Sequence, residues 1–301
     1  MKIDSRLASS IVGKDFIVTA EYLPQASADP AAVESCAGVM RDKVVAVNAA
    51  DNHFSVAMSS LAASLALARA GIEPVLQLVT RDRNRIALQS DLLGAASLGI
   101  KNVLCLSGYH QGLAVSPQAS NVYDIDSIQL VAAVRRMNEE GTLLNGTRIQ
   151  GGFAMLIGGV ANPYLKPLQL NIIRLKKKIA AGADFIQTQA VFDVETFKDW
   201  IGEAGKEGLT GRAAILAGVM PLASADEART LRDTYTDYVI PDDVIKRLES
   251  AGNVESQRKE GIAICADIIK QLKNISGIRG IHILCGGNET SVPEIISATA
   301  I

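Results

Sequence analysis

Short apolar segments alternate with amphipathic ones about eight times along this chain, and this alternation constrains the fold more than any other feature. The apolar segments are rich in Val, Ile and Leu on both faces, as strands of a fully covered parallel sheet should be. The predicted strands are Phe16–Leu23, Lys43–Asn48, Pro74–Val79, Asn102–Ser107, Gly151–Gly158, Asp184–Val191, Ala213–Met220 and Gly280–Gly287. Apolar residues spaced by three and four predict helices that include Phe54–Ala70, Arg85–Leu98, Leu170–Ala181, Val194–Ala204 and Val254–Leu272.

Eight strand–helix repeats predict an α/β fold, a single (β/α)8 TIM barrel that occupies residues 1–301 as one domain. Gly71, Gly99 and Gly182 follow predicted helices at positions where left-handed caps are expected. The alternative is a doubly wound open sheet, but no GxGxxG motif follows the first predicted strand. The barrel is therefore the preferred fold.

Composition narrows the class of protein. The 301 residues are 48% hydrophobic and 21% charged, which is typical of a globular chain with a large core. A formal net charge of -2 argues against nucleic acid as a partner. No apolar run is long enough to span a membrane, and residues 1–13 lack the pattern of a signal peptide. Four scattered cysteines without a CxxC pair favour reduced thiols and no metal site, so we expect a cytoplasmic protein.

Polar side chains gather where several predicted strands end. In a barrel of this type the carboxyl ends of the strands carry the catalytic groups. The sixth strand ends in Gln187-Thr188-Gln189, and the first carries Glu21 within an apolar run. A charge at such a position is costly unless it is functional or paired. Glu21 is therefore either a functional carboxyl or one partner of a structural ion pair with an arginine.

Other strand ends offer ligand contacts of lower specificity. Gln77 lies within the third strand, and Arg81 and Arg83 follow it, where they could hold a carboxylate or phosphate or form a solvated rim. The fourth strand leads into Ser107-Gly108-Tyr109, where the glycine permits a ligand to approach the backbone. Lys178 belongs to a run of three lysines that either faces solvent or reaches a phosphate from the rim.

Several motifs, in order along nearly the whole chain, resemble the methylenetetrahydrofolate reductase family. Glu21-Tyr22-Leu23-Pro24 matches the family's Phe-Glu-Phe-Phe-Pro pattern. The other matching segments are Arg81-Asp82-Arg83-Asn84, Asp91–Ala95 with Leu98–Leu104, and Lys178–Gln189. The resemblance implies a flavin-containing (β/α)8 barrel that reduces 5,10-methylenetetrahydrofolate to 5-methyltetrahydrofolate.

The resemblance also implies roles for individual residues. Glu21 matches the general acid that protonates N10 of the folate, and burial would raise its pKa into a useful range. Gln189 matches the glutamine that hydrogen-bonds the pterin ring, and we add Gln77 as a second substrate-binding residue. The implied flavin-binding residues are Asn48, Ser107, Gly108, Tyr109, Tyr123 and Lys178.

Departures from the family pattern concern the flavin half of the site. Ser107-Gly108-Tyr109 stands where the family usually has Arg-Gly-Asp or a close variant, so the carboxylate near the flavin is replaced by Tyr109. FAD, FMN and loss of flavin all remain open, as do NAD(P)H and a partner subunit as electron donor. A homo-oligomer or a heteromeric complex is expected. The competing hypothesis is a non-redox folate-binding or methyl-handling barrel.

Overall fold

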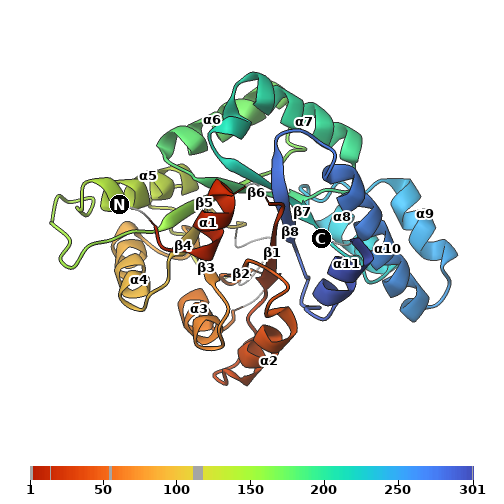
Figure 1. Cartoon of the computed structure of the whole chain (residues 1–301), viewed down its shortest axis with the longest axis horizontal. Helices are drawn as coiled ribbons and strands as arrows, with labels where there is room; N and C mark the ends of the chain where they lie inside the picture. Colours follow the sequence, from red (N-terminus) through yellow and green to blue (C-terminus); the bar gives the residue numbers. More distant parts are fainter. Residues whose placement is uncertain (1–2, 14, 54–55, 111–117, 300) are drawn as a thin grey trace.

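Eight parallel strands close into one barrel in which each strand pairs with its neighbour in sequence and β1 pairs with β8 (Figure 1). This computed structural model describes residues 3–13, 15–53, 56–110, 118–299 and 301. The strands are β1 (Ile17–Tyr22), β2 (Ala46–Ala49), β3 (Pro74–Val79), β4 (Asn102–Leu106), β5 (Leu156–Ala161), β6 (Phe185–Ala190), β7 (Ala214–Val219) and β8 (Ile278–Ile283). The predicted α/β barrel is confirmed.

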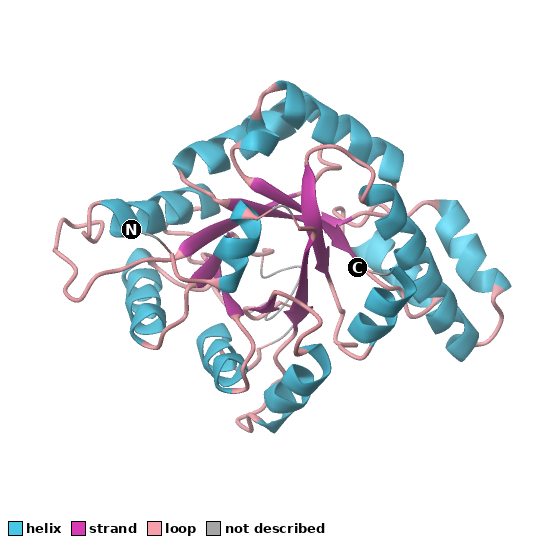
Figure 2. Ribbon diagram, viewed as in Figure 1, coloured by secondary structure: helices cyan, strands magenta, loops and turns pink. Residues whose placement is uncertain are grey.

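Helices surround the strands as an outer layer (Figure 2), apart from α1, which lies across one end of the barrel (Figure 1). They are α1 (Arg6–Val12), α2 (Ala31–Met40), α3 (Ser60–Arg69), α4 (Arg85–Ser97), α5 (Ser127–Glu139), α6 (Leu168–Ala181), α7 (Val194–Lys206), α8 (Ala225–Thr234), α9 (Asp242–Ser250), α10 (Val254–Leu272) and α11 (Ser291–Thr299), with a short 3-10 helix, η2, at Leu209–Gly211. Within the described ranges, no helix has the length and apolarity needed to cross a membrane.

Local chemistry explains where individual helices begin and end. The Asn84 side chain accepts hydrogen bonds from the first backbone N–H groups of α4, and Asp126 forms a capping box with Gln129 at α5. Gly182 ends α6 with a φ of 118°, and Gly71 and Gly99 each have a φ of 82° after α3 and α4. The predicted left-handed caps are therefore confirmed.

Three predicted strands differ from the observed ones by more than one residue at an end. β5 begins at Leu156 because Gly151 and Gly152 both have a φ of +81°, outside the extended region of a strand. β8 ends at Ile283, before Gly286 and Gly287 turn the chain with positive φ values. β2 covers Ala46–Ala49 instead of Lys43–Asn48, since Lys43 lies in a turn and the two residues after it form an irregular segment with a bend.

The long third helix is also shorter than the predicted Phe54–Ala70. α3 starts at Ser60, where the hydroxyl of Ser59 accepts a hydrogen bond from the Ala62 N–H. Residues 56–59 precede it without helical structure, and Phe54 and Ser55 lie outside the described residues.

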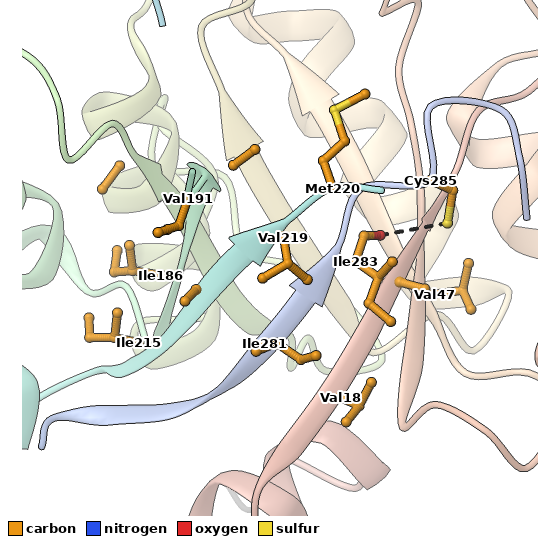
Figure 3. Close-up of a cluster of buried hydrophobic side chains, with 14 of the residues drawn as sticks. Val18, Val47, Ile186, Val191, Ile215, Val219, Met220, Ile281, Ile283 and Cys285 are labelled. Carbon is orange, nitrogen blue, oxygen red and sulfur yellow. Dashed lines mark hydrogen bonds between the residues drawn. The ribbon is translucent and has the colours of Figure 1, made fainter. Parts of the chain in front are cut away.

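The hydrophobic core has an inner and an outer part because successive strand residues face opposite sides of the sheet. Ile17 lies in the inner cluster, inside the barrel, whereas its neighbour Val18 lies in the outer cluster beneath the helices. Figure 3 shows the outer cluster along β7 and β8, where the Cys285 thiol donates to the Ile283 carbonyl. The inner cluster also includes Leu7 of α1, which Figure 1 shows in red in front of the ring of strands.

A buried polar layer lies above the inner apolar cluster. Asn48 Nδ2 donates to Gln187 Oε1 over 2.7 Å, and Gln187 Nε2 lies 3.3 Å from Asn48 Oδ1. The same Gln187 nitrogen lies 3.2 Å from His282 Nδ1, which in turn lies 2.9 Å from the Thr19 hydroxyl. Burial lowers the pKa of His282 to about 3, so the imidazole is neutral at physiological pH. These side chains form a polar floor under the mouth of the barrel.

Candidate functional site

A pocket of about 480 Å³ opens at the carboxyl ends of β3 to β6, the end where active sites of this fold occur. Its volume is within the usual range for small-molecule sites. Six of the nine site residues predicted from the sequence line it, namely Gln77, Ser107, Gly108, Tyr109, Lys178 and Gln189. The barrel therefore brings together side chains that are more than a hundred residues apart in the chain.

Glu21 lies at the end of β1 and is 6% exposed. It is not part of the pocket wall, but Gln77 on that wall donates from Nε2 to Glu21 Oε2 over 3.4 Å. No ion pair among the described residues includes Glu21, so the structural alternative of a partner arginine does not hold there. Burial raises the pKa of Glu21 from 4.5 to about 7, against the lowering effect of Gln77 and with a further increase from Glu289. A large part of this carboxyl carries a proton at neutral pH.

Gln189 and Tyr109 both donate hydrogen bonds to the carboxylate of Asp237, a residue that the sequence patterns did not predict for the site. Asp237 Oδ2 accepts hydrogen bonds from the Tyr109 hydroxyl and from Gln189 Nε2, each over 2.6 Å. Asp237 lies in the connection between α8 and α9, where nothing in the local sequence predicts a site residue. Only the closed barrel places this connection beside the ends of β4 and β6.

The two arginines after β3 are held by neighbouring carboxylates. Arg81 pairs with Asp82 over 2.8 Å, and Arg83 pairs with Asp51 over 2.6 Å. Arg81 is 1% exposed, and its Nη1 also donates to the backbone carbonyl of Tyr109 over 3.3 Å. The arginines thus fix the loops that carry Tyr109 and the pocket wall, and their charges are already matched.

The far end of the pocket is cationic. Arg174 and Lys178 lie one turn apart on α6, and both line the pocket together with Ser127 at the start of α5. Lys178 Nζ donates to the Val160 carbonyl, and burial lowers the pKa of Lys178 to about 8. Neither cation forms an ion pair with a carboxylate in the described part of the chain. This end is therefore suited to an anionic group such as a phosphate, although Asp126 already caps α5 there.

Gly108 shapes the wall between the mouth and the cationic end. Its φ is +82°, and an added Cβ would lie 3.2 Å from Arg81 Cβ and 3.3 Å from Val79 Cβ. The carbonyl of Gly108 accepts a hydrogen bond from the Tyr123 hydroxyl over 3.3 Å. A side chain at position 108 would strain the turn and occupy space next to the pocket.

Three predicted site residues lie off the pocket wall. Glu21 lies behind Gln77, Asn48 is fully buried in the polar floor, and Tyr123 is 39% exposed beside Gly108. Asn48 and Tyr123 would therefore contact a ligand in this pocket only indirectly, as supports of the floor and of the loop after β4. Their assignment to the cofactor stays a prediction.

Comparison with known proteins gives a consistent result. A family model described as methylenetetrahydrofolate reductase matches residues 6–300. A probable methylenetetrahydrofolate reductase (NADPH) of Caenorhabditis elegans is 24% identical over 244 residues, which cover 81% of this chain and 34% of that protein. A 5,10-methylenetetrahydrofolate reductase of Pectobacterium carotovorum subsp. carotovorum is 24% identical over 217 residues, which cover 71% of this chain and 65% of that protein. The chain thus spans less than two thirds of either relative.

Among solved structures, an uncharacterized protein from Clostridium thermocellum superposes with a TM-score of 0.69. That protein binds two copies of 5-methyl-5,6,7,8-tetrahydrofolic acid. The match covers 98% of this chain and 99% of the other at 14% sequence identity, and at this identity it shows the shared fold.

Proposed function

The chain belongs to the methylenetetrahydrofolate reductase family, and on that premise we propose that it reduces 5,10-methylenetetrahydrofolate to 5-methyltetrahydrofolate with a bound flavin. The observation that carries the proposal is Glu21, a buried carboxyl whose pKa of about 7 makes it a proton donor at neutral pH. A protein that only bound folate would have no evident need for this acid, whereas opening the five-membered ring of the substrate requires a proton at N10.

In the proposed reaction, Glu21 holds the proton and delivers it to N10 of the folate. Gln77 connects Glu21 to the pocket, because it contacts the carboxyl and also lines the wall. Gln189 binds the pterin ring from the opposite side of the mouth, through an amide that can both donate and accept. Together these side chains orient the folate so that N10 faces the acid.

The residues present fit a flavin. Arg174 and Lys178 would hold its phosphate, since both line the pocket and neither has a carboxylate partner among the described residues. Gly108 leaves space for the ring against the backbone after β4, where a Cβ would crowd the wall. When bound, the flavin supplies hydride transfer to the methylene carbon. FAD and FMN share the ring and its first phosphate, so the cationic end suits either of them.

The electron donor and the assembly are further parts of the proposal. NAD(P)H or an electron-donating partner subunit would supply the electrons, and a homo-oligomer or a heteromeric complex is the expected state. Stopped-flow reduction of the purified protein by NADH or NADPH separates the two donors. If NADH or NADPH reduces the flavin within the time of one catalytic cycle, the donor is a nicotinamide. If neither reduces it, a partner protein is supported as the donor.

The second candidate function, a non-redox folate-binding or methyl-handling barrel, is favoured by Tyr109. Its side chain extends to Asp237, and it stands where the family usually has an aspartate. The Clostridium thermocellum protein with this fold binds 5-methyltetrahydrofolic acid. A folate carrier could share the pterin contacts of the proposed reductase.

One preparation of the full chain tests both candidates. Its visible spectrum is recorded first, followed by oxidation of 5-methyltetrahydrofolate with an artificial quinone as electron acceptor. Flavin absorption together with turnover supports the reductase. A colourless protein that cannot be loaded with FAD or FMN, yet binds 5-methyltetrahydrofolate, would refute the reductase and support the second candidate.

A further inference from the structure

We propose that Asp237 is a positioning residue that fixes the amide orientation of Gln189, so that the pocket offers a hydrogen-bond acceptor, Gln189 Oε1, to the N–H groups of a pterin ring. This inference rests on the proposed function in one respect, namely that the ligand at Gln189 is a folate. It goes beyond that function because it assigns a role to a residue outside the family motifs and off the pocket wall.

The contacts of Asp237 join three separate segments. Tyr109 follows β4, Gln189 belongs to β6, and Asp237 lies between α8 and α9. Both side-chain donors reach the same carboxylate oxygen over 2.6 Å. This distance is usual for a hydroxyl that donates to a carboxylate and short for an amide N–H. Tyr109 and Gln189 line the pocket, so Asp237 acts on a ligand through them.

The chemistry of the carboxylate determines the orientation of the amide. Asp237 Oδ2 accepts the hydrogen bonds from both side chains, so the part of the Gln189 amide that faces it is the NH2 group. The amide oxygen then points away from Asp237. Without the carboxylate, the nearly equal size of the two ends would let the amide turn over. Asp237 therefore selects which end of the amide is available to a ligand.

Aromatic packing holds the segment that carries Asp237. The rings of Tyr109 and Tyr235 lie 5.4 Å apart, and those of Tyr235 and Tyr238 lie 6.0 Å apart. Tyr238 is 7% exposed, so the residue after Asp237 is anchored in the core. Ring contacts therefore hold the chain on both sides of the aspartate.

The alternative is that Asp237 only ties two loops together. Binding measurements distinguish these roles, because a positioning residue affects pterin recognition and a structural tie affects every ligand. We would compare 5-methyltetrahydrofolate with p-aminobenzoylglutamate, which has the folate tail but no pterin ring. Both are titrated by calorimetry into the full chain and into Asp237→Asn, Asp237→Glu and Tyr109→Phe, after thermal melting has shown that each variant is folded.

We expect Asp237→Asn to weaken 5-methyltetrahydrofolate binding at least tenfold, or about 1.4 kcal/mol, and to leave p-aminobenzoylglutamate binding within twofold. Asp237→Glu keeps a carboxyl oxygen as acceptor and should recover most of the affinity. Tyr109→Phe should cost less than threefold, since the hydrogen bond from Gln189 to Asp237 remains. In turnover, Asp237→Asn should raise KM by the same factor as Kd and leave kcat within threefold.

Two results would overturn the inference alone. One is an Asp237→Asn variant that binds 5-methyltetrahydrofolate as well as the unmodified chain does. The other is an equal loss of affinity for both ligands, which would show a structural tie. A different result, in which the unmodified chain fails to bind 5-methyltetrahydrofolate at all, would overturn the proposed function and the inference with it.

Discussion

At the scale of single residues, the site depends on side chains whose surroundings change their ordinary behaviour. Glu21 is almost fully buried, with one amide as its side-chain hydrogen-bond partner, and its carboxyl keeps a proton that an exposed glutamate would lose. The pKa of Lys178 is lowered because burial disfavours the charged ammonium group. A carboxyl that is partly protonated near pH 7 and a cation at the other end of the pocket both suit the proposed reduction of a folate.

The first prediction concerns Glu21→Gln. The amide keeps the shape of the side chain and removes its acidic proton. We expect 5-methyltetrahydrofolate binding within about threefold of the unmodified chain, and loss of turnover by a factor of about 10² or more. Calorimetry gives the affinity, and the quinone-coupled assay gives the rate. Turnover equal to that of the unmodified chain would remove Glu21 from the mechanism.

The raised pKa of Glu21 also predicts how folding stability depends on pH. In the unfolded chain this carboxyl ionises near 4.5, and in the folded chain it ionises near 7. Between these values the unfolded chain has released the proton and the folded chain still holds it. The contribution of Glu21 to the free energy of unfolding therefore falls as pH rises from about 4.5 to about 7 and stays constant above that. A shift of this size corresponds to a loss on the order of 3 kcal/mol.

The Glu21→Gln variant has no carboxyl to ionise at this position, so it does not lose stability in this way as pH rises. The difference in free energy of unfolding between the variant and the unmodified chain should therefore grow in favour of the variant between pH 4.5 and pH 8. Urea unfolding at several pH values measures it. Parallel stability curves for the two proteins would show that folding does not raise the pKa of Glu21.

Lys178 can be tested independently of activity. Lys178→Ala removes a half-buried cation from the far end of the pocket and should reduce the flavin retained after dialysis, as measured by visible absorption. Lys176→Ala is the matched control, because Lys176 is exposed on the same helix and pairs with Glu207. Equal flavin content in both variants would place the phosphate elsewhere.

At the scale of elements, local patterns predicted the strands well and their limits less well. Apolar runs identified all eight strands, but backbone conformation set the ends of some of them, as at Gly151 and Gly152 before β5. The position of Gln189 at the end of β6 followed from the strand pattern alone. The partnership of Gln189 with Asp237 could not be predicted, because their contact depends on loop geometry that no local pattern encodes.

The pairing of β6 and β7 gives a prediction at this scale. The register shifts between Gln187 and Ala190, opposite Gly218 of β7. An added Cβ at Gly218 would lie 2.3 Å from the Thr188 carbonyl oxygen and 2.8 Å from that of Gln189. Gly218→Ala should therefore displace the backbone of Gln189, lower the free energy of unfolding by about 1–3 kcal/mol, and weaken folate binding.

The matched control is Gly202→Ala. Gly202 lies exposed within α7, where an added Cβ meets nothing within 4 Å. An alanine there should raise stability by roughly 0.5–1 kcal/mol and leave binding unchanged. Chemical unfolding and calorimetry compare the two variants, and similar behaviour of both would contradict the role assigned to the β6 register shift.

At the scale of the whole molecule, the two ends of the barrel have different roles. The carboxyl ends of the strands carry the pocket, and α1 belongs to the opposite end. Leu7 of α1 is fully buried in the inner cluster, and the backbone N–H groups of Arg6 and Leu7 donate to Glu73. Arg279 holds the end of the same helix through backbone carbonyls, including that of Gly13. This helix closes the inner core.

This division predicts that stability can be changed without changing the site. Leu7→Ala should lower the free energy of unfolding by about 2–5 kcal/mol because it leaves a cavity in the inner core. Folate affinity and kcat per folded molecule should stay within twofold. Val12→Ala is the control, since Val12 is 88% exposed on the same helix and its loss should cost less than about 0.5 kcal/mol. A change of KM in Leu7→Ala would mean that the two ends are coupled.

The amide pair of Asn48 and Gln187 in the polar floor limits which substitutions the two positions can accept during evolution. These side chains cross the barrel from β2 to β6 and hydrogen-bond each other. An apolar replacement of Gln187 leaves the buried Asn48 amide without this partner, and one of Asn48 leaves Gln187 Oε1 without its donor. Neither position can accept such a replacement alone at low cost. We therefore expect positions 48 and 187 to covary among homologous barrels, so that a substitution at one is accompanied by a substitution at the other.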